Sequence, residues 1–129
     1  MSKTLIVGLC GSTINARRAA IEALKALEPE ALDLTIPSNV RAPWRRGDAL
    51  YEEFEATPPG HVVLCDIQCA EEADTIECFG GFVVHVEGVP SDDIAIKRDT
   101  LLLTMKPEDR GRYTTPVNTL AKLKSIKWQ

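Results

Sequence analysis

Small and polar residues followed by two arginines form the first group whose types and spacing could do chemistry. The group comprises Gly11, Ser12, Thr13, Asn15, Arg17 and Arg18. It directly follows an apolar run at residues 5–9, so it is expected to form the turn between a strand and a helix. Backbone N–H groups at the positive end of such a helix can hold an anion. The segment therefore predicts a phosphate-binding turn.

The two arginines stand where a helix normally avoids positive charge. Arg17 and Arg18 fall in the first turn of the predicted helix, where the helix dipole disfavours a cation by some tenths of a kcal/mol. An anionic partner would offset that penalty. The alternative is a pair of arginines that water solvates on an exposed helix, and the sequence leaves both interpretations open.

A carboxylate ends a second apolar run, at residues 61–66. Asp66 is the last residue of this run, and a carboxylate at the end of a buried strand can hold a magnesium ion directly or through water. Asp66 is accordingly the candidate metal ligand. The alternative is that Asp66 caps the helix predicted to follow it.

Cations surround an aromatic residue in a proline-bearing stretch. The cluster consists of Arg41, Trp44, Arg45 and Arg46. Tryptophan and arginine are common anchors of protein interfaces, and they can also stack on a base or a nucleotide. We interpret the cluster first as a surface that binds a protein partner, and an ordinary loop remains the alternative.

Strands and helices alternate along the chain that must position these residues. Apolar runs predict strands at 5–9, 32–36, 61–66, 82–86 and 100–104, and helical spacing predicts helices at 16–28, at 70–79 and from 115 onward. Prolines mark 37–60 as mostly irregular, with a short helix near 49–55. This alternation predicts a single α/β domain over residues 1–129, with three layers and a mainly parallel sheet.

The expected fold brings the turn and the carboxylate to one place. Ligands of open parallel sheets bind beyond the carboxyl ends of the strands, where the strand order reverses. The turn after residues 5–9 and Asp66 both lie at such ends. The sequence thus predicts one site at this edge of the sheet.

Composition narrows the classes of partner. The 129 residues carry a formal net charge of -4, and the acidic pI of about 5.2 argues against a protein that coats duplex DNA. Binding of single-stranded nucleic acid through the arginines and Trp44 is a third-ranked hypothesis. No apolar run is long enough to span a bilayer and no secretory signal is recognisable, so we expect a cytoplasmic protein that does not bind membranes.

Two stretches resemble the deoxynucleoside monophosphate kinases of phages and bacteria, which are P-loop kinases. Residues 8–18 read GLCGSTINARR and align without a gap with the family's G-L-x-G-x-x-G-x-G-K-D pattern. Residues 62–81 read VVLCDIQCAEEADTIECFGG and match the later V-V-I-x-D-V-R-F-x-N-E-A-x-x-I-x-x-x-G-G pattern, which is the more specific one. The resemblance implies a P-loop-kinase-like fold, with Gly8 and Gly11 near a nucleotide phosphate and Asp66 on magnesium.

The departures from that pattern concern the groups that drive phosphoryl transfer. Arg17 replaces the lysine that reaches the phosphates, and Ala19 replaces the hydroxyl that ligates magnesium. Arginine is no simple substitute, because its planar fork is bulkier than an ammonium group. The stretch 37–60 is also short for the family's substrate and lid region, so the resemblance implies a reduced version of the fold.

Two functional hypotheses follow from the resemblance and its departures. The first is a non-catalytic kinase-like protein, encoded by a phage, that needs no cofactor and binds a host protein or other macromolecular partner in the host cytoplasm. The alternative is a nucleotide-binding protein or an active nucleoside monophosphate kinase that uses ATP and magnesium. In that case Arg17 and Asp66 are the candidate catalytic residues.

Overall fold

The strands of the sheet coincide with the apolar runs of the sequence. The computed structural model describes residues 4–11, 13–91, 93–98 and 100–127. Its strands are β1 (Leu5–Cys10), β2 (Leu32–Asp33), β3 (Val62–Asp66), β4 (Phe82–Val86), β5 (Leu101–Leu103) and β6 (Tyr113–Thr114). They pair in parallel in the order β2-β3-β1-β4-β5-β6. The predicted parallel sheet is confirmed, while β2 is shorter than expected and β6 was not predicted.

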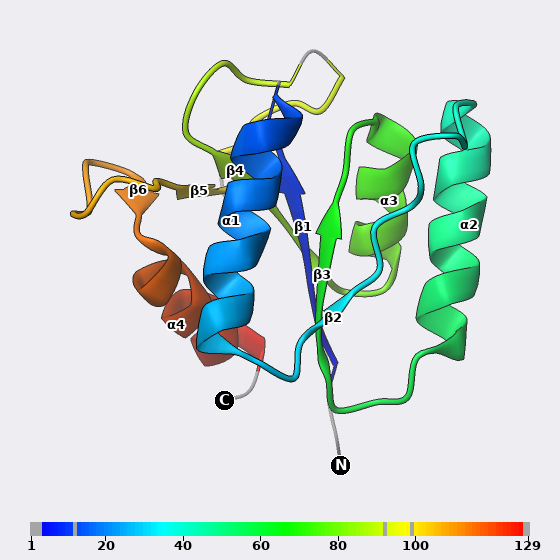
Figure 1. Ribbon diagram of the computed structural model, residues 1–129, viewed down its shortest axis with the longest axis horizontal. Helices are drawn as coiled ribbons and strands as arrows, with labels where there is room; N and C mark the ends of the chain where they lie inside the picture. Colours follow the sequence, from blue (N-terminus) through cyan, green and yellow to red (C-terminus); the bar gives the residue numbers. More distant parts are fainter. Residues whose placement is uncertain (1–3, 12, 92, 99, 128–129) are drawn as a thin grey trace.

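Helices cover both faces of this sheet. They are α1 (Ile14–Leu27), α2 (Pro43–Ala56), α3 (Ala70–Cys78) and α4 (Pro116–Lys127). Helices α1 and α4 lie on one face, and α2 and α3 lie together on the other (Figure 1). The predicted three-layer α/β architecture is therefore confirmed.

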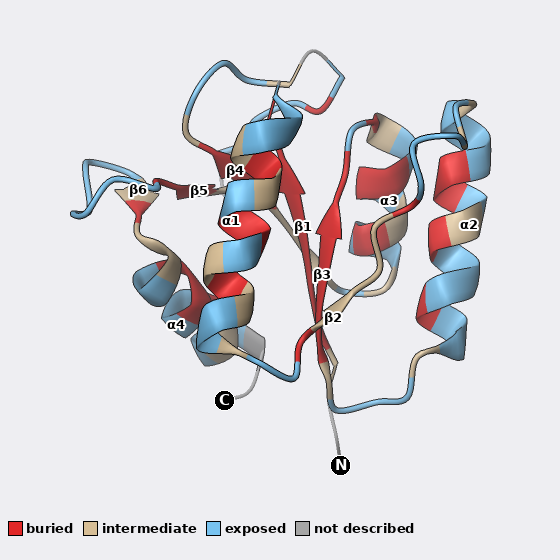
Figure 2. Ribbon diagram, viewed as in Figure 1, coloured by how far each residue is buried: buried red, intermediate tan, exposed pale blue. Residues whose placement is uncertain are grey.

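The central strand β1 contributes side chains to two apolar cores, one on each face of the sheet. Leu5, Val7 and Leu9 belong to the core under α1 and α4, whereas Ile6 and Cys10 belong to the core under α2 and α3. Side chains alternate between the two faces of a strand, so a continuous apolar run is what a strand covered on both faces requires. Figure 2 shows β1 and β3 as buried along their length.

Two glycines let α3 approach the sheet closely. A Cβ on Gly81 would lie 2.8 Å from the Ile6 carbonyl oxygen and 2.9 Å from Cγ2 of Ile76. Gly8 lies inside β1, where a Cβ would collide with the end of the Ile76 side chain. The structure thus gives Gly8 a packing role that the sequence did not suggest.

The largest difference from expectation is α2. Residues 37–60 were predicted to be mostly irregular, yet Pro43–Ala56 forms a helix of 14 residues. Pro43 starts this helix, at a position where the missing N–H of proline costs nothing. Within the helix, a Cβ on Gly47 would lie 3.2 Å from the Glu71 carbonyl oxygen, so the glycine permits close packing of α2 on the start of α3.

The connections after β1 and β3 leave the sheet on opposite faces. The neighbouring strands β1 and β3 lead into α1 and α3, which cover different faces of the sheet (Figure 1). This divergence opens a crevice beyond their carboxyl ends, the usual ligand position in such sheets. None of the helices in the described part of the chain is long and apolar enough to cross a membrane.

Candidate functional site

A small cavity lies at the crevice that the sequence predicted. Its volume is about 260 Å³, and its walls come from the start of α1, the segment after β2, and the carboxyl end of β3. Three arginines line it, Arg17, Arg18 and Arg46, together with Asp66. The structure therefore brings the predicted arginines of α1 and the predicted carboxylate to one place, and adds an arginine from α2.

The turn between β1 and α1 is short. Helix α1 begins at Ile14, with the exposed Thr13 as its N-cap, and the Thr13 hydroxyl accepts a hydrogen bond from the Ala16 N–H at 3.4 Å. Asn15 is already helical and exposed. Gly11 is buried at the end of β1, and Ser12 lies outside the described residues. Within the stretch aligned with a phosphate-wrapping loop, residues 8–10 therefore belong to β1 and residues 14–18 to the start of α1.

Arg17 is buried, and its Nε and Nη1 groups are held by its own chain. Its Nε donates to Oδ1 of Asp66, and its Nη1 donates to the Gly11 carbonyl oxygen at 2.7 Å. The two side chains are only 7% and 5% exposed. Burial raises the pKa of Asp66, and the positive charge of Arg17 opposes that rise. Arg17 is thus not a solvated arginine on an exposed helix, which was one of the two interpretations of its position, and its partners within the chain are Asp66 and Gly11.

Arg18 forms a second ion pair at the mouth of the cavity. Its Nη2 donates to Oδ2 of Asp33 at 2.7 Å, and its Nη1 donates to the Thr35 hydroxyl at 3.2 Å. Burial alone would raise the pKa of Asp33, but hydrogen bonds from Arg18 and Thr35 lower it overall. The Thr35 hydroxyl also accepts from the Asp66 N–H at 3.0 Å. These bonds join the end of β2 to the end of β3.

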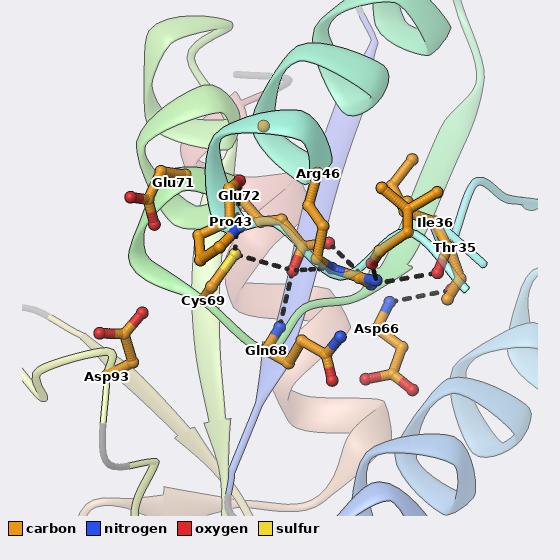
Figure 3. A network of polar contacts seen from close by, with 12 residues as sticks. Thr35, Ile36, Pro43, Arg46, Asp66, Gln68, Cys69, Glu71, Glu72 and Asp93 are labelled. Atoms are coloured by element: carbon orange, nitrogen blue, oxygen red, sulfur yellow. Dashed lines mark hydrogen bonds and ion pairs between the residues drawn. The ribbon is translucent and has the colours of Figure 1, made fainter. Parts of the chain in front are cut away.

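Arg46 forms the third pair and is also a clamp on the loop before α2 (Figure 3). Its Nε donates to Oε1 of Glu72 at 3.1 Å. Its two Nη groups donate to the carbonyl oxygens of Ile36, Pro37 and Val40 at 2.7–3.1 Å. The prediction that Arg46 binds a partner is wrong, because this side chain is 4% exposed and its donors point inward.

Glu72 and Asp93 satisfy the start of α3, which was one role considered for Asp66. The Glu72 carboxylate is fully buried and accepts from the Gln68 N–H at 2.9 Å and from Sγ of Cys69 at 3.4 Å. Asp93 accepts from the Ala70 N–H at 2.7 Å, and Figure 3 shows both acids at this helix end. Asp66 is therefore left to Arg17.

The charges that surround the cavity balance. The pairs are Arg17 with Asp66, Arg18 with Asp33, and Arg46 with Glu72. An entering phosphate would have to displace a carboxylate from one of these guanidinium groups, at the cost of leaving that carboxylate without its partner. The site can hold its own elements together, and it offers an anion little unpaired positive charge.

The rest of the arginine and tryptophan cluster faces outward. Arg41 and Arg45 are exposed, and Trp44 is 61% exposed on the outer side of α2. The guanidinium carbon of Arg45 lies 5.6 Å from the centroid of the Trp44 ring, a distance typical of cation–π contact. These three residues can reach a partner, unlike Arg46.

Glu72 and His85 are buried polar residues that the sequence analysis did not identify as functional. Glu72 stands three residues after the N-cap Cys69 of α3, a spacing typical of an acid that turns back to cap a helix. His85, on β4, is 2% exposed, and the backbone of Ala95 lies beside its ring. Among the described residues, no group of three or more His, Cys, Asp or Glu side chains could hold a metal ion.

Comparison of the chain with protein-family models, with curated proteins and with solved structures gave no match.

Proposed function

We propose that this chain is a non-catalytic, kinase-like protein, encoded by a phage, that acts in the host cytoplasm by binding a host protein. The observation that carries the proposal is the buried ion pair between Arg17 and Asp66. In the family that the sequence resembles, these positions serve a nucleotide phosphate and its magnesium ion. Here the two groups neutralise each other within the fold.

The chemistry of phosphoryl transfer supports this conclusion. Catalysis of that reaction depends on cations placed against the transferred phosphate and on a metal held by a carboxylate. Arg17 already donates to Asp66 and to Gly11, and the Asp66 carboxylate already has a cation beside it. Withdrawing Arg17 from this buried pair would cost several kcal/mol, which would be subtracted from any gain on nucleotide binding.

Binding of a partner is assigned to the exposed side of α2. Trp44 is a large aromatic side chain in water, flanked by Arg41 and Arg45, and tryptophan and arginine dominate the energetic centres of interfaces. Affinity capture from a host lysate, with the wild type and with Trp44→Ala, checks this assignment. We expect a stoichiometric partner for the wild type that the variant loses, and capture of none counts against a host partner.

A second candidate function is nucleotide binding, which the presence of three guanidinium groups around one cavity favours. The cavity of about 260 Å³ is smaller than most ligand sites, which span roughly 300–1,000 Å³. It is large enough for a phosphate group, but the nucleoside would lie in the open.

Calorimetry separates the two candidates. We expect no heat of binding when ATP with magnesium, or a deoxynucleoside monophosphate, is titrated into the protein, and no phosphate transfer when both are supplied. Micromolar affinity that Arg17→Ala abolishes would favour the nucleotide-binding alternative. Turnover of a deoxynucleoside monophosphate would overturn the proposal outright. Arg45→Ala is the matched control, because this arginine lies on the outside of α2.

A further inference from the structure

Helix α2 buries one side against the domain and leaves the other side open. Its buried residues are Arg46, Gly47, Leu50 and Phe54, and the helix packs on α3. The opposite side carries Trp44, Arg45, Asp48, Glu52 and Glu55, all of them exposed. Figure 2 shows this side of α2 as largely exposed surface at the edge of the molecule. We call these five residues, together with Tyr51, the outer face of α2; Tyr51 lies at the border of this face, because its ring also packs edge-on against Phe79 at a centroid distance of 4.9 Å.

Two pairs on the outer face are spaced seven residues apart. Residues with this spacing lie two turns apart on nearly the same line along a helix. Trp44 and Tyr51 form an aromatic line, with exposures of 61% and 43%. Arg45 and Glu52 form a neighbouring line of opposite charges.

The charge on this face changes sign along the helix. Arg41 and Arg45 lie at its start, and Glu52 and Glu55 lie in its last turns. This arrangement opposes the helix dipole, which favours acids at the start and bases at the end. Consistent with that, α2 has no acidic residue in its first turn, no basic residue in its last turn, and no side-chain hydrogen bond at its N-cap.

A face with this pattern is complementary to itself in the antiparallel orientation. When two such helices lie side by side in opposite directions, the basic start of each meets the acidic end of the other. A two-fold axis then places Arg45 against Glu52 of the second copy, and Trp44 against Tyr51 of the second copy. Each helix also receives, from its neighbour, the charges that its own dipole lacks.

We propose that two copies of this chain pair through the outer face of α2, antiparallel and about a two-fold axis. The inference goes beyond the proposed function, because a second copy on this surface would compete with a host protein that binds there. A partner with only acidic groups would match the start of the face but repel its end, whereas a second copy matches both. Closed two-fold contacts of this kind are the commonest form of self-association.

The proposal predicts a weak, salt-sensitive dimer. One helix face is a small interface, so we expect a dissociation constant of about 10 µM or weaker. Its charge contacts are exposed and will be screened as salt is added. Asp48 lies near the middle of the face, so the two-fold axis places it beside Asp48 of the second copy. This contact between like charges opposes pairing.

Sedimentation equilibrium of the full chain over a concentration series at low salt tests the proposal. We expect Arg45→Glu and Glu52→Arg each to weaken dimerisation about tenfold, because each change creates two like-charge contacts. Mixing the two variants in equal amounts restores both contacts, so the mixture should form a heterodimer about as strong as the wild type. Trp44→Ala should weaken the dimer, and Asp48→Asn should strengthen it.

The charge variants also show whether a weaker dimer results from lost contacts or from misfolding. All the changed residues are exposed, and recovery in the mixture cannot occur if either variant is unfolded. A wild type that stays monomeric into the millimolar range overturns the inference, as does a dimer that the variants leave unchanged. Neither result touches the non-catalytic role, which depends on the nucleotide titrations alone.

Discussion

Replacing Arg17 with methionine tests how much the buried pair contributes. Methionine keeps most of the length of the side chain and removes its charge, so Asp66 is left in a site where it is 5% exposed. Removing one partner of a buried pair costs about 3–5 kcal/mol, because the other charge stays buried without compensation. That is a large part of the roughly 5–15 kcal/mol by which a domain is normally stable.

A double-mutant cycle measures the coupling itself. Urea unfolding of the wild type, Arg17→Met, Asp66→Val and the double variant gives the four free energies of unfolding. We expect the double variant to lose far less than the sum of the single losses, because it leaves no unpaired charge. Arg18→Met is the control, since its half-exposed pair with Asp33 should contribute about 1 kcal/mol or less. Additive losses at positions 17 and 66 would refute the interpretation of the pair.

The loss of stability in Arg17→Met should depend on pH, and the direction of that dependence can be predicted. The folded state raises the pKa of Asp66 through burial, and Arg17 limits that rise. A carboxyl with a raised pKa stabilises the fold below its unfolded pKa, and this contribution is lost as pH rises through the folded pKa. Removing Arg17 enlarges the rise, so the deficit of Arg17→Met should be smaller at about pH 5 than near neutrality. An equal deficit at both would contradict the reasoning.

Two further changes should separate buried from exposed groups. Arg46→Met should cost about 3–5 kcal/mol in urea unfolding because it strands Glu72, whereas Arg45→Met next to it should stay within about 0.5 kcal/mol; similar losses would show that the clamp is not formed. Burial lowers the pKa of His85 in the folded protein, so at a given pH of about 6 the unfolded chain binds this proton more fully than the folded one does. The free energy of unfolding should therefore fall as pH drops below about 6.5, by at most about 1.4 kcal/mol per pH unit. His85→Leu should remove that part of the slope, and an unchanged slope would assign it to another group.

Local patterns were sufficient for most of the architecture and failed at α2. The apolar runs of β1, β3 and β4 and the stripes of α1 and α3 predicted their elements because most of the side chains that each buries are apolar. In α2 the buried side consists of Arg46, Gly47, Leu50 and Phe54. Two of these four are types normally found on surfaces or in turns, so the helical stripe was hidden. The prolines before the helix then favoured an irregular segment.

No local sequence pattern could predict which acid pairs with which arginine in the site. The sequence placed Arg17 and Asp66 at the same edge of the sheet, but they stand 49 positions apart, and no spacing rule says that they bind each other. Arg46 and Glu72 are 26 positions apart. Both arginines were expected to serve something outside the chain. Arg17 meets its acid where α1 packs beside β3, and Arg46 meets its acid where α2 packs on α3.

The pair of Arg46 with Glu72 also explains how the outer face of α2 is held in position. Arg46 binds the carbonyl oxygens of residues 36, 37 and 40, and through Glu72 it ties them to the start of α3. This loop leads directly into α2, so the clamp fixes where the helix begins. Arg46, which lines the cavity, therefore holds a helix in place, and the side of that helix that faces water is open to a partner. We accordingly expect that weakening the clamp disturbs pairing through α2, even though Arg46 lies on the buried side of the helix.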